Sequence, residues 1–226
     1  MKQCVILAGG RGTRLGALSE HLPKPLQPVA GRPFLAHLFA KAALSGFSEI
    51  LLLAGFKAEA VAAFAEDEVR RHPGLTASLS VEPQPLGTAG ALAHASSLLD
   101  ERFLLVNGDT WFDFDWPALT VAEPAAVSVA LRHVAIADRY ETAKLEGGLI
   151  TALEPRDAAR ADGLINGGVY AMDRRAVLTG ETSLEQETLP RLRREGRLAG
   201  ARFEGAFIDI GVPESLAAAQ ELTFPA

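Results

Sequence analysis

The first half of the chain alternates short apolar runs with segments of helical periodicity, and this alternation limits the fold more than any other feature of the sequence. Residues 3–8 form an apolar run that ends at Gly9 and Gly10, which is typical of a strand buried on both faces of a parallel sheet. In residues 33–45 the apolar side chains recur at helical spacing, and Gly46 is a stop signal. The pattern predicts right-handed βαβ units and a sheet covered by helices on both faces.

The alternation continues to Asp109 and then gives way to shorter strands. Further strands are predicted over residues 50–53, 77–81 and 103–106, and helices over residues 57–64 and 88–98. Beyond Asp109, strands are predicted at 126–131, 142–145, 149–153, 165–171 and 198–203, a short apolar segment at 207–210, and helices at 184–194 and 213–222. We therefore expect an α/β fold, a Rossmann-like three-layer sandwich with a mostly parallel, mixed central sheet, in a single domain over residues 1–226.

Composition and charge exclude several classes of protein. The net charge of -6 argues against a nucleic-acid partner, because binding to a phosphate backbone depends on clustered Lys and Arg. The single cysteine, Cys4, excludes an intramolecular disulfide and a multi-cysteine zinc site, which favours a reducing compartment. No run reaches the roughly 18 apolar residues of a membrane span. We expect a cytoplasmic protein with neither a nucleic-acid nor a membrane partner.

A glycine-rich turn follows the first predicted strand at residues 9–15, and Pro-Lys-Pro follows at 23–25. Such a turn lets backbone N–H groups approach phosphate oxygens, and Arg14 and Lys24 supply cations for a triphosphate. A P-loop would need Gly-Lys-Ser/Thr, and a dinucleotide fingerprint would need Gly at the position of Leu15. A plain glycine-rich connection is the alternative, and the two cations count against it. The segment is therefore predicted to bind phosphates.

Two carboxylates follow apolar runs. Asp109 comes after the predicted strand at 103–106, where open α/β sheets bind ligands, and Asp209 ends the short run at 207–210. Taken singly, each aspartate also fits a simple turn. A hard cation that bridges phosphates needs one or two such carboxylates.

The motif Gly-Gly-Arg-Gly-Thr-Arg-Leu at 9–15, with Pro-Lys-Pro ten residues on, resembles the signature of the sugar-phosphate nucleotidyltransferases, also called nucleotide-sugar pyrophosphorylases. The resemblance continues at 82–90, 107–109, 166–170 and 207–213, so it covers nearly the whole chain. It implies the nucleotide-diphospho-sugar transferase type of fold. It also implies a nucleotide-binding half at about 1–109 and a sugar-binding half at about 110–226.

The resemblance assigns roles residue by residue. It implies that Arg14, Lys24 and Asp109 are catalytic and that Asp109 and Asp209 hold Mg²⁺. The implied nucleotide-binding residues are Leu7, Ala8, Gly9, Gly10, Gly12, Thr13, Glu82, Gly87, Thr88 and Gly108. The implied sugar-binding residues are Glu154, Asn166, Gly167 and Glu185. The family often has a lysine just after the position of Glu154, where this chain has Pro155 and Arg156.

The family reads the base with the segment at 82–90. Guanine presents N1–H and a 2-amino group side by side, and a carboxylate accepts from both, so Glu82 favours guanine. Gln84 keeps a pyrimidine nucleotide possible as the substrate. Uracil and thymine present one hydrogen-bond donor between two acceptors, and an amide side chain suits that pattern.

The implied reaction transfers a nucleoside monophosphate from an NTP to a sugar 1-phosphate and releases pyrophosphate. Within the family the motifs are most similar to those of D-glycero-α-D-manno-heptose 1-phosphate guanylyltransferases, which use GTP and by analogy serve a surface polysaccharide. Mannose 1-phosphate guanylyltransferases and N-acetylmuramate 1-phosphate uridylyltransferases are the alternatives. The alternative from a different functional class is a binding module, a catalytically silent subunit that senses a nucleotide sugar. The sequence leaves the oligomeric state open, a homodimer included.

Overall fold

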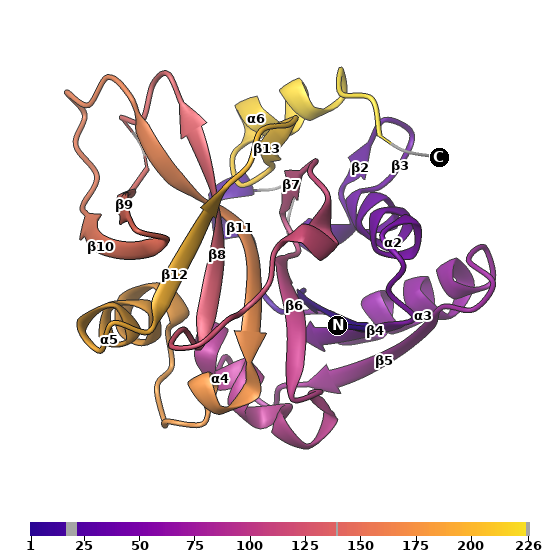
Figure 1. The fold of residues 1–226 in the computed structure, drawn as a ribbon. Coiled ribbons are helices and arrows are strands. Elements are labelled where there is room, and N and C mark those ends of the chain that lie inside the picture. Colours follow the sequence, from indigo (N-terminus) through magenta and orange to yellow (C-terminus); the bar gives the residue numbers. More distant parts are fainter. Residues whose placement is uncertain (17–21, 139, 225–226) are drawn as a thin grey trace.

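The computed structural model describes residues 1–16, 22–138 and 140–224. Its centre is a nine-stranded sheet with the strand order β5-β4-β1-β6-β11-β8-β12-β10-β9 (Figure 1). The first four strands in this order are parallel: β5 (Thr76–Val81), β4 (Glu49–Ala54), β1 (Gln3–Leu7) and β6 (Arg102–Asn107). Their carboxyl ends therefore meet at one edge of the sheet.

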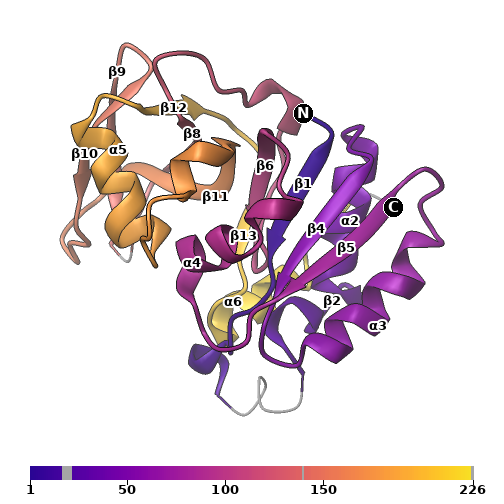
Figure 2. The same cartoon turned by 90° about the horizontal axis from the view of Figure 1, so that it is seen from below.

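Helices cover both faces of this parallel part (Figure 2). Along β1, Cys4 and Ile6 pack into one core with α2 (Phe34–Leu44) and α3 (Ala58–Val69). Val5 points the other way, into a second core that includes residues of α4 (Gly87–His94). Burial on both faces explains why the strand is a continuous apolar run, and it confirms the predicted three-layer α/β fold.

The second half of the sheet is mixed rather than parallel. β11 (Gly163–Asp173) runs antiparallel to both β6 and β8 (Val127–Val134), whereas β12 (Leu198–Arg202) is parallel to β8. β10 (Leu149–Glu154) and β9 (Thr142–Glu146) follow as an antiparallel pair, and β9 returns to pair with β11. These strands thus curl into a small ring, over which α5 (Leu189–Arg194) packs with Leu189 and Leu192.

The predicted elements differ from the observed ones mainly at their ends. Helix α3 continues to Val69, beyond the predicted residue 64, and α4 ends at His94 before a 3₁₀ turn, Ser96–Leu98. The helix predicted at 184–194 is a π-helical turn, Leu184–Thr188, followed by α5. The closing helix α6 spans Pro213–Ala219.

Short strands absent from the sequence prediction add two small pairings. β2 (Pro28–Val29) pairs with β3 (Arg32–Pro33), and β7 (Thr110–Phe112) pairs antiparallel with β13 (Phe207–Asp209). In the second pairing Asp209 lies opposite Thr110, so two segments a hundred residues apart are joined directly beside Asp109. No helix among the described residues has both the length and the apolar character needed to cross a membrane.

Candidate active site

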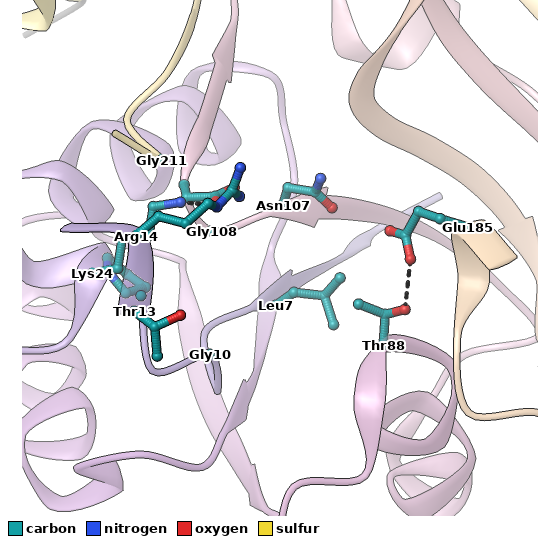
Figure 3. Close-up of a pocket in the computed structure, with 13 residues that line it drawn as sticks. Leu7, Gly10, Thr13, Arg14, Lys24, Thr88, Asn107, Gly108, Glu185 and Gly211 are labelled. Carbon is teal, nitrogen blue, oxygen red and sulfur yellow. Dashed lines mark hydrogen bonds and ion pairs between the residues drawn. The ribbon is translucent and has the colours of Figure 1, made fainter. Parts of the chain in front are cut away.

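A cleft opens at the edge of the sheet where β1 and β6 end (Figure 3). Its middle part, here called the central pocket, has a volume of about 390 Å³. Residues of the glycine-rich turn, both predicted cations, the end of β6 and two segments of the second half line it: Leu7, Gly10, Gly12, Thr13, Arg14, Lys24, Pro25, Thr88, Asn107, Gly108, Asp109, Glu185 and Gly211.

The glycine-rich turn forms one wall of the central pocket. Gly12 adopts a φ of 66°, in the left-handed region that glycine tolerates best, and a 3₁₀ turn, Thr13–Leu15, follows. This turn buries Leu15 in the core and leaves Arg14 exposed toward the cleft. A side chain added at Gly10 would meet open space, so the backbone there is accessible to a ligand.

Lys24 and two carboxylates meet beside Arg14, on the same side of the pocket as the glycine-rich turn. Lys24 is buried, donates a hydrogen bond to Asp109 Oδ2, and lies 3.8 Å from Asp209 Oδ1. Asp209 Oδ1 also accepts a hydrogen bond of 2.6 Å from the Gly211 amide. Burial and the neighbouring charge of Asp109 raise the pKa of Asp209, and Lys24 opposes this shift. The two acids therefore repel each other across a shared cation.

Local backbone geometry explains why these groups converge. Gly108 donates a hydrogen bond of 3.0 Å to the Leu7 carbonyl, and a Cβ at Gly108 would collide with that oxygen. β6 can thus approach the end of β1 and deliver Asp109 to the cleft. A Cβ at Gly211 would lie 3.0 Å from Lys24 Nζ and 3.4 Å from an Arg14 guanidinium nitrogen, so glycine there lets both cations gather beside Asp209.

The two carboxylates suit a divalent cation that is completed by a ligand. No group of three or more His, Cys, Asp or Glu side chains in the described part of the chain could hold a metal ion by itself. Mg²⁺ characteristically binds one or two carboxylates together with substrate phosphates and water. Asp109 and Asp209 offer hard oxygen donors, and because burial and then the charge of Asp109 raise the pKa of Asp209, a cation between them would favour its charged form.

A second cavity, the Glu82 pocket, adjoins the central pocket and measures about 260 Å³. It shares residues of β1, the glycine turn and α4 with the central pocket, and its lining is Leu7, Gly9, Gly10, Arg11, Leu53, Glu82, Pro85, Gly87, Thr88 and Ala91. Glu82 packs against Gly9 and Gly55, and its Oε2 accepts a hydrogen bond of 2.9 Å from the Leu86 amide. Gln84 is exposed and is not among the lining residues.

A third cavity, the Tyr170 pocket, adjoins the central pocket on the other side and measures about 370 Å³. Its lining comes mainly from the second half: Asn107, Thr110, Tyr140, Glu141, Arg156, Asn166, Gly168, Tyr170, Ser183, Glu185, Gln186, Phe207 and Asp209. Asn166 Nδ2 donates a hydrogen bond of 2.8 Å to the Tyr170 hydroxyl, and burial raises the pKa of Tyr170. Asn107 Oδ1 is buried and finds no hydrogen-bond donor among the described residues.

Comparison with known proteins identifies this arrangement. The family model described as nucleotidyl transferase matches residues 3–224. The chain belongs to the nucleotidyl transferase family. It is a sugar-phosphate nucleotidyltransferase with an α/β fold and a mixed central sheet, as the sequence predicts.

Individual relatives span almost the whole chain. The D-glycero-alpha-D-manno-heptose 1-phosphate guanylyltransferase of Campylobacter jejuni is 33% identical over 220 residues, which cover 94% of this chain and 96% of the relative. The enzyme of the same name from Aneurinibacillus thermoaerophilus is 30% identical and covers 97% of both chains. The crystal structure of HddC from Yersinia pseudotuberculosis complexed with GMP-PN superposes with a TM-score of 0.81 at 27% identity, covering 98% of this chain and 99% of that one.

Most residues that the family resemblance nominates lie along the cleft of this nucleotidyltransferase. The central and Glu82 pockets bring together Leu7, Gly9, Gly10, Gly12, Thr13, Arg14, Lys24, Glu82, Gly87, Thr88, Gly108 and Asp109. The Tyr170 pocket adds Asn166 and Asp209, and Glu185 lines both this pocket and the central one. Ala8 is fully buried in the core, one residue beyond the last lining position of β1.

Besides Ala8, two further nominated residues lie outside the pocket linings. Glu154 lies in ion pairs with Arg160 and, at 2.7 Å, Lys144; the Arg160 hydrogen bond lowers its pKa to about 2, and it is not among the residues that line the three pockets. Gly167 is buried, and a Cβ there would lie 2.5 Å from the Phe112 ring, so glycine is needed for packing.

The sequence analysis quoted the motifs at 107–109 and 166–170 but gave no role to three residues within them that line the Tyr170 pocket. Asn107 directly precedes Gly108-Asp109, and Tyr170 and Gly168 follow Asn166 within the same strand. Gly168, with a φ of 72°, faces the Tyr170 pocket, whereas Gly167 faces the core. A kink at Gly168 is the feature that a plain strand alternation does not predict, although consecutive glycines hint at it.

Proposed function

We propose that the protein is a Mg²⁺-dependent guanylyltransferase that joins GMP from GTP to D-glycero-α-D-manno-heptose 1-phosphate and releases pyrophosphate. The observation that carries the proposal is the single cleft of three adjoining pockets, in whose middle part Arg14 and Lys24 lie beside Asp109. A nucleoside triphosphate that reacts with a sugar phosphate needs three sites in a row, for the base, for the reacting phosphates and for the sugar. The names of the two heptose 1-phosphate guanylyltransferase relatives support the choice of substrates.

The Glu82 pocket is assigned to the base. Its walls are largely apolar, with Leu53, Pro85 and Ala91 available to pack against a ring, and Glu82 supplies the carboxylate that two guanine donors need. Gln84 does not line this pocket, so we assign it no contact with a pyrimidine base. The HddC structure, which was solved in complex with GMP-PN, supports a guanine nucleotide as the ligand.

The central pocket is assigned to the reacting phosphates. An oxygen of the sugar 1-phosphate attacks the α-phosphorus of GTP, the bond from that phosphorus to the bridging oxygen of the β-phosphate breaks, and pyrophosphate leaves. Arg14 and the amides of the glycine turn hold the β- and γ-phosphates, and Lys24 offsets charge that develops at the α-phosphorus. The protein thus acts by positioning and neutralising charge, without a nucleophile of its own.

Asp109 and Asp209 are the residues that would hold Mg²⁺. When bound, the ion neutralises phosphate oxygens and acts as a Lewis acid at the reacting phosphate. Lys24 stays beside both carboxylates in this assignment, which keeps the fixed cation next to the transferring group.

The Tyr170 pocket is assigned to the sugar. Asn166 and Glu185 present amide and carboxylate groups that suit hydroxyls, and Asn107 Oδ1 offers an unused acceptor where this pocket meets the central one. Arg156 lines the same pocket and takes the place of the lysine common in the family. Glu154 supports this wall indirectly, because its ion pair with Arg160 ties together the two ends of the loop that carries Arg156.

Pyrophosphate release tests the proposal. GTP, UTP, dTTP, CTP and ATP are each combined with the 1-phosphates of the heptose, mannose, glucose and N-acetylmuramate, with Mg²⁺ and with EDTA in its place. We expect the highest kcat/KM for GTP with the heptose 1-phosphate, and no release in EDTA. Preference for mannose 1-phosphate or for UTP would replace the substrate assignment, and no release with any pair would favour the silent, nucleotide-sugar-sensing subunit.

A further inference from the structure

Segment 181–188, from the second half of the chain, docks on the amino end of α4, from the first half. The Thr182 carbonyl accepts hydrogen bonds from the amides of Ala89, at 3.0 Å, and Gly90, at 3.3 Å. Amides in the first turn of a helix have no partner within the helix, so Thr182 caps α4. A Cβ at Gly87 would collide with the same carbonyl, which shows how closely the two parts approach.

The docking continues into the cleft through Thr88 (Figure 3). The Thr88 hydroxyl accepts a hydrogen bond of 2.8 Å from the Leu184 amide and donates one of 2.9 Å to Glu185 Oε2. Thr88 lines the central and Glu82 pockets, and Glu185 lines the central and Tyr170 pockets. One side-chain hydrogen bond therefore joins the wall of the base pocket to the wall of the sugar pocket.

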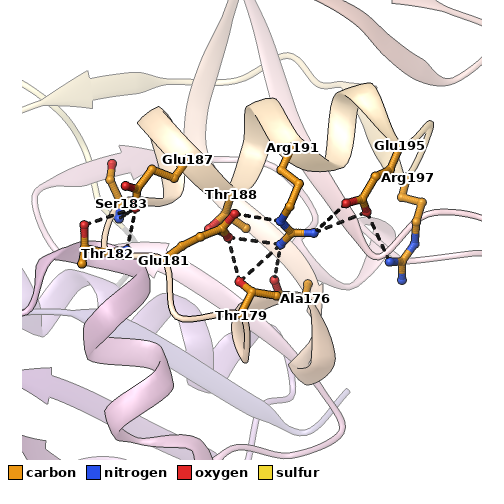
Figure 4. A network of polar contacts seen from close by, with 10 residues as sticks. All are labelled: Ala176, Thr179, Glu181, Thr182, Ser183, Glu187, Thr188, Arg191, Glu195 and Arg197. Atoms are coloured by element: carbon orange, nitrogen blue, oxygen red, sulfur yellow. Dashed lines mark hydrogen bonds and ion pairs between the residues drawn. The ribbon is translucent and has the colours of Figure 1, made fainter.

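A network of acidic and hydroxyl side chains behind the cleft fixes the segment that carries Glu185 (Figure 4). Glu187 Oε2 accepts hydrogen bonds from the amides of Thr182, at 2.6 Å, and Ser183, at 3.1 Å. Glu181 accepts one of 2.7 Å from Arg191 Nε. We call Glu181, Glu187 and Arg191 the clasp.

The clasp anchors the segment to the body of the second half. Glu181 also accepts a hydrogen bond of 2.7 Å from the fully buried Thr188, and Arg191 donates one of 3.0 Å to the Ala176 carbonyl. The side chains of Glu181 and Arg191 are only 17% and 20% exposed, so water screens their attraction weakly. The residues of the clasp are not among those that line the three pockets.

Between the two anchors the chain forms the π-helical turn Leu184–Thr188. Such turns are rare and occur frequently at functional sites, because the extra residue in the turn changes the direction in which a side chain points. Here the turn carries Glu185. Glu187, within the turn, binds the backbone that precedes it, and Glu181 before the turn pairs with Arg191 on α5 after it.

We propose that Glu181, Glu187 and Arg191 are positioning residues that set the affinity of the enzyme for its sugar 1-phosphate by holding Glu185 against Thr88. The proposal rests on the proposed function, in which Glu185 binds the sugar. Thr88 belongs to α4, which its buried residues Ala89 and Leu92 keep in place. The buried Leu184 and Thr188 hold the turn that carries Glu185 in the core, and the clasp adds the polar contacts that fix the turn against α4. Loosening the clasp therefore affects the sugar far more than the nucleotide.

The test compares Arg191→Ala with Glu195→Ala. Glu195 accepts hydrogen bonds from the same arginine at 3.2 and 3.3 Å but makes no hydrogen bond or ion pair with the segment 181–188 among the described residues, so it is the matched control. In Arg191→Ala we expect the KM for the sugar 1-phosphate to rise about tenfold, as for weakening a hydrogen bond to a charged group, with the KM for GTP within about twofold. Glu195→Ala should keep both constants.

A second pair separates positioning from simple loss of stability. Glu187→Ala removes the acceptor for the Thr182 and Ser183 amides and should raise the sugar KM, whereas Glu187→Gln retains an acceptor oxygen and should restore it. Equal rises in both KM values, an unchanged sugar KM in folded Arg191→Ala and Glu187→Ala, or a lower melting temperature without a KM change would overturn the proposal. If Arg191→Ala does not fold, the Glu187 pair decides.

A readout independent of catalysis keeps this proposal distinct from the proposed function. The KM values are measured with whichever NTP and sugar 1-phosphate the wild type uses best, so a different substrate leaves the test intact. Amide hydrogen exchange at Ala89 and Gly90 should accelerate at least about tenfold in Glu187→Ala and not in Glu195→Ala. Unchanged exchange at both amides would show that the clasp does not hold the segment, whatever the reaction.

Discussion

The two ends of the cleft are built in different ways. At the phosphate end, the contacts come from the backbone of the glycine turn and from charges delivered by adjacent strand ends, such as Asp109 after β6. At the end proposed to bind the sugar, Asn166 and Tyr170 come from β11 and are joined by a side-chain hydrogen bond, and Glu185 comes from a separate segment and is held by Thr88 of the first half. The first kind of site follows from local sequence, whereas the second depends on pairings between distant residues.

The largest effect is expected at the phosphate end, from Lys24→Ala. Loss of a fixed cation beside the reacting phosphates should lower kcat by about 10²–10³, measured as pyrophosphate release at saturating substrates. Lys41→Ala is the control, because Lys41 pairs with Asp113 at 2.6 Å and does not line the three pockets. Comparable losses in the two variants, or a normal kcat in Lys24→Ala, would refute the role of Lys24.

A pair of glycine substitutions separates folding from binding at the same end. Gly108→Ala places a Cβ against the Leu7 carbonyl and should lower the free energy of unfolding by about 1–3 kcal/mol, as other overpacked sites do. Gly10→Ala meets open space, so it should leave stability unchanged and weaken GTP binding instead. Urea unfolding and GTP titration measure the two quantities. A reversed pattern would show that the turn is structural.

At the sugar end, two glutamates should behave differently. Glu185→Ala removes a carboxylate from the Tyr170 pocket and should raise the KM for the sugar 1-phosphate about tenfold. Glu154→Ala breaks ion pairs outside the pocket and should change that KM by no more than about twofold. If initial rates show the larger effect for Glu154, the motif-based assignment is right and the structural one is wrong.

The smallest effect concerns the pH dependence of stability at the sugar end. Hydrogen bonds from Arg191 lower the pKa of Glu181 from 4.5 to about 2, so its ion pair stabilises the fold above about pH 4.5 and the contribution is lost as the pH falls toward 2. The difference in unfolding free energy between wild type and Glu181→Gln should therefore shrink over that range. Urea midpoints that keep a constant separation down to about pH 3 would contradict the assigned ion pair.

The fold and the phosphate end could be predicted from the sequence because their signals are local. A continuous apolar run such as β1 is stable only where both of its faces are buried, and the glycines directly after it permit the tight turn that follows. The three-layer α/β fold and the family are confirmed. The individual site assignments stay predictions until variants are measured.

The parts that could not be predicted depend on distant partners. β7 has three residues, too few for a periodic signal, and is a strand only because β13 pairs with it. Glu154 matches a family position, but Lys144 and Arg160 take its carboxylate in this chain. The clasp likewise cannot be predicted from the local sequence. Glu181 and Glu187 resemble ordinary surface charges there, and only the folded structure brings them together with Arg191 and the docked α4.

Transfer of a labelled phosphate tests the central claim most directly. The enzyme is incubated with Mg²⁺, D-glycero-α-D-manno-heptose 1-phosphate and GTP that carries the label in either the α- or the γ-phosphate. The account predicts that the α-label moves into the GDP-sugar while the γ-label leaves in pyrophosphate, and that both transfers stop without the sugar 1-phosphate. An α-label that stays in GTP, or appears only in free GMP or GDP, would contradict it.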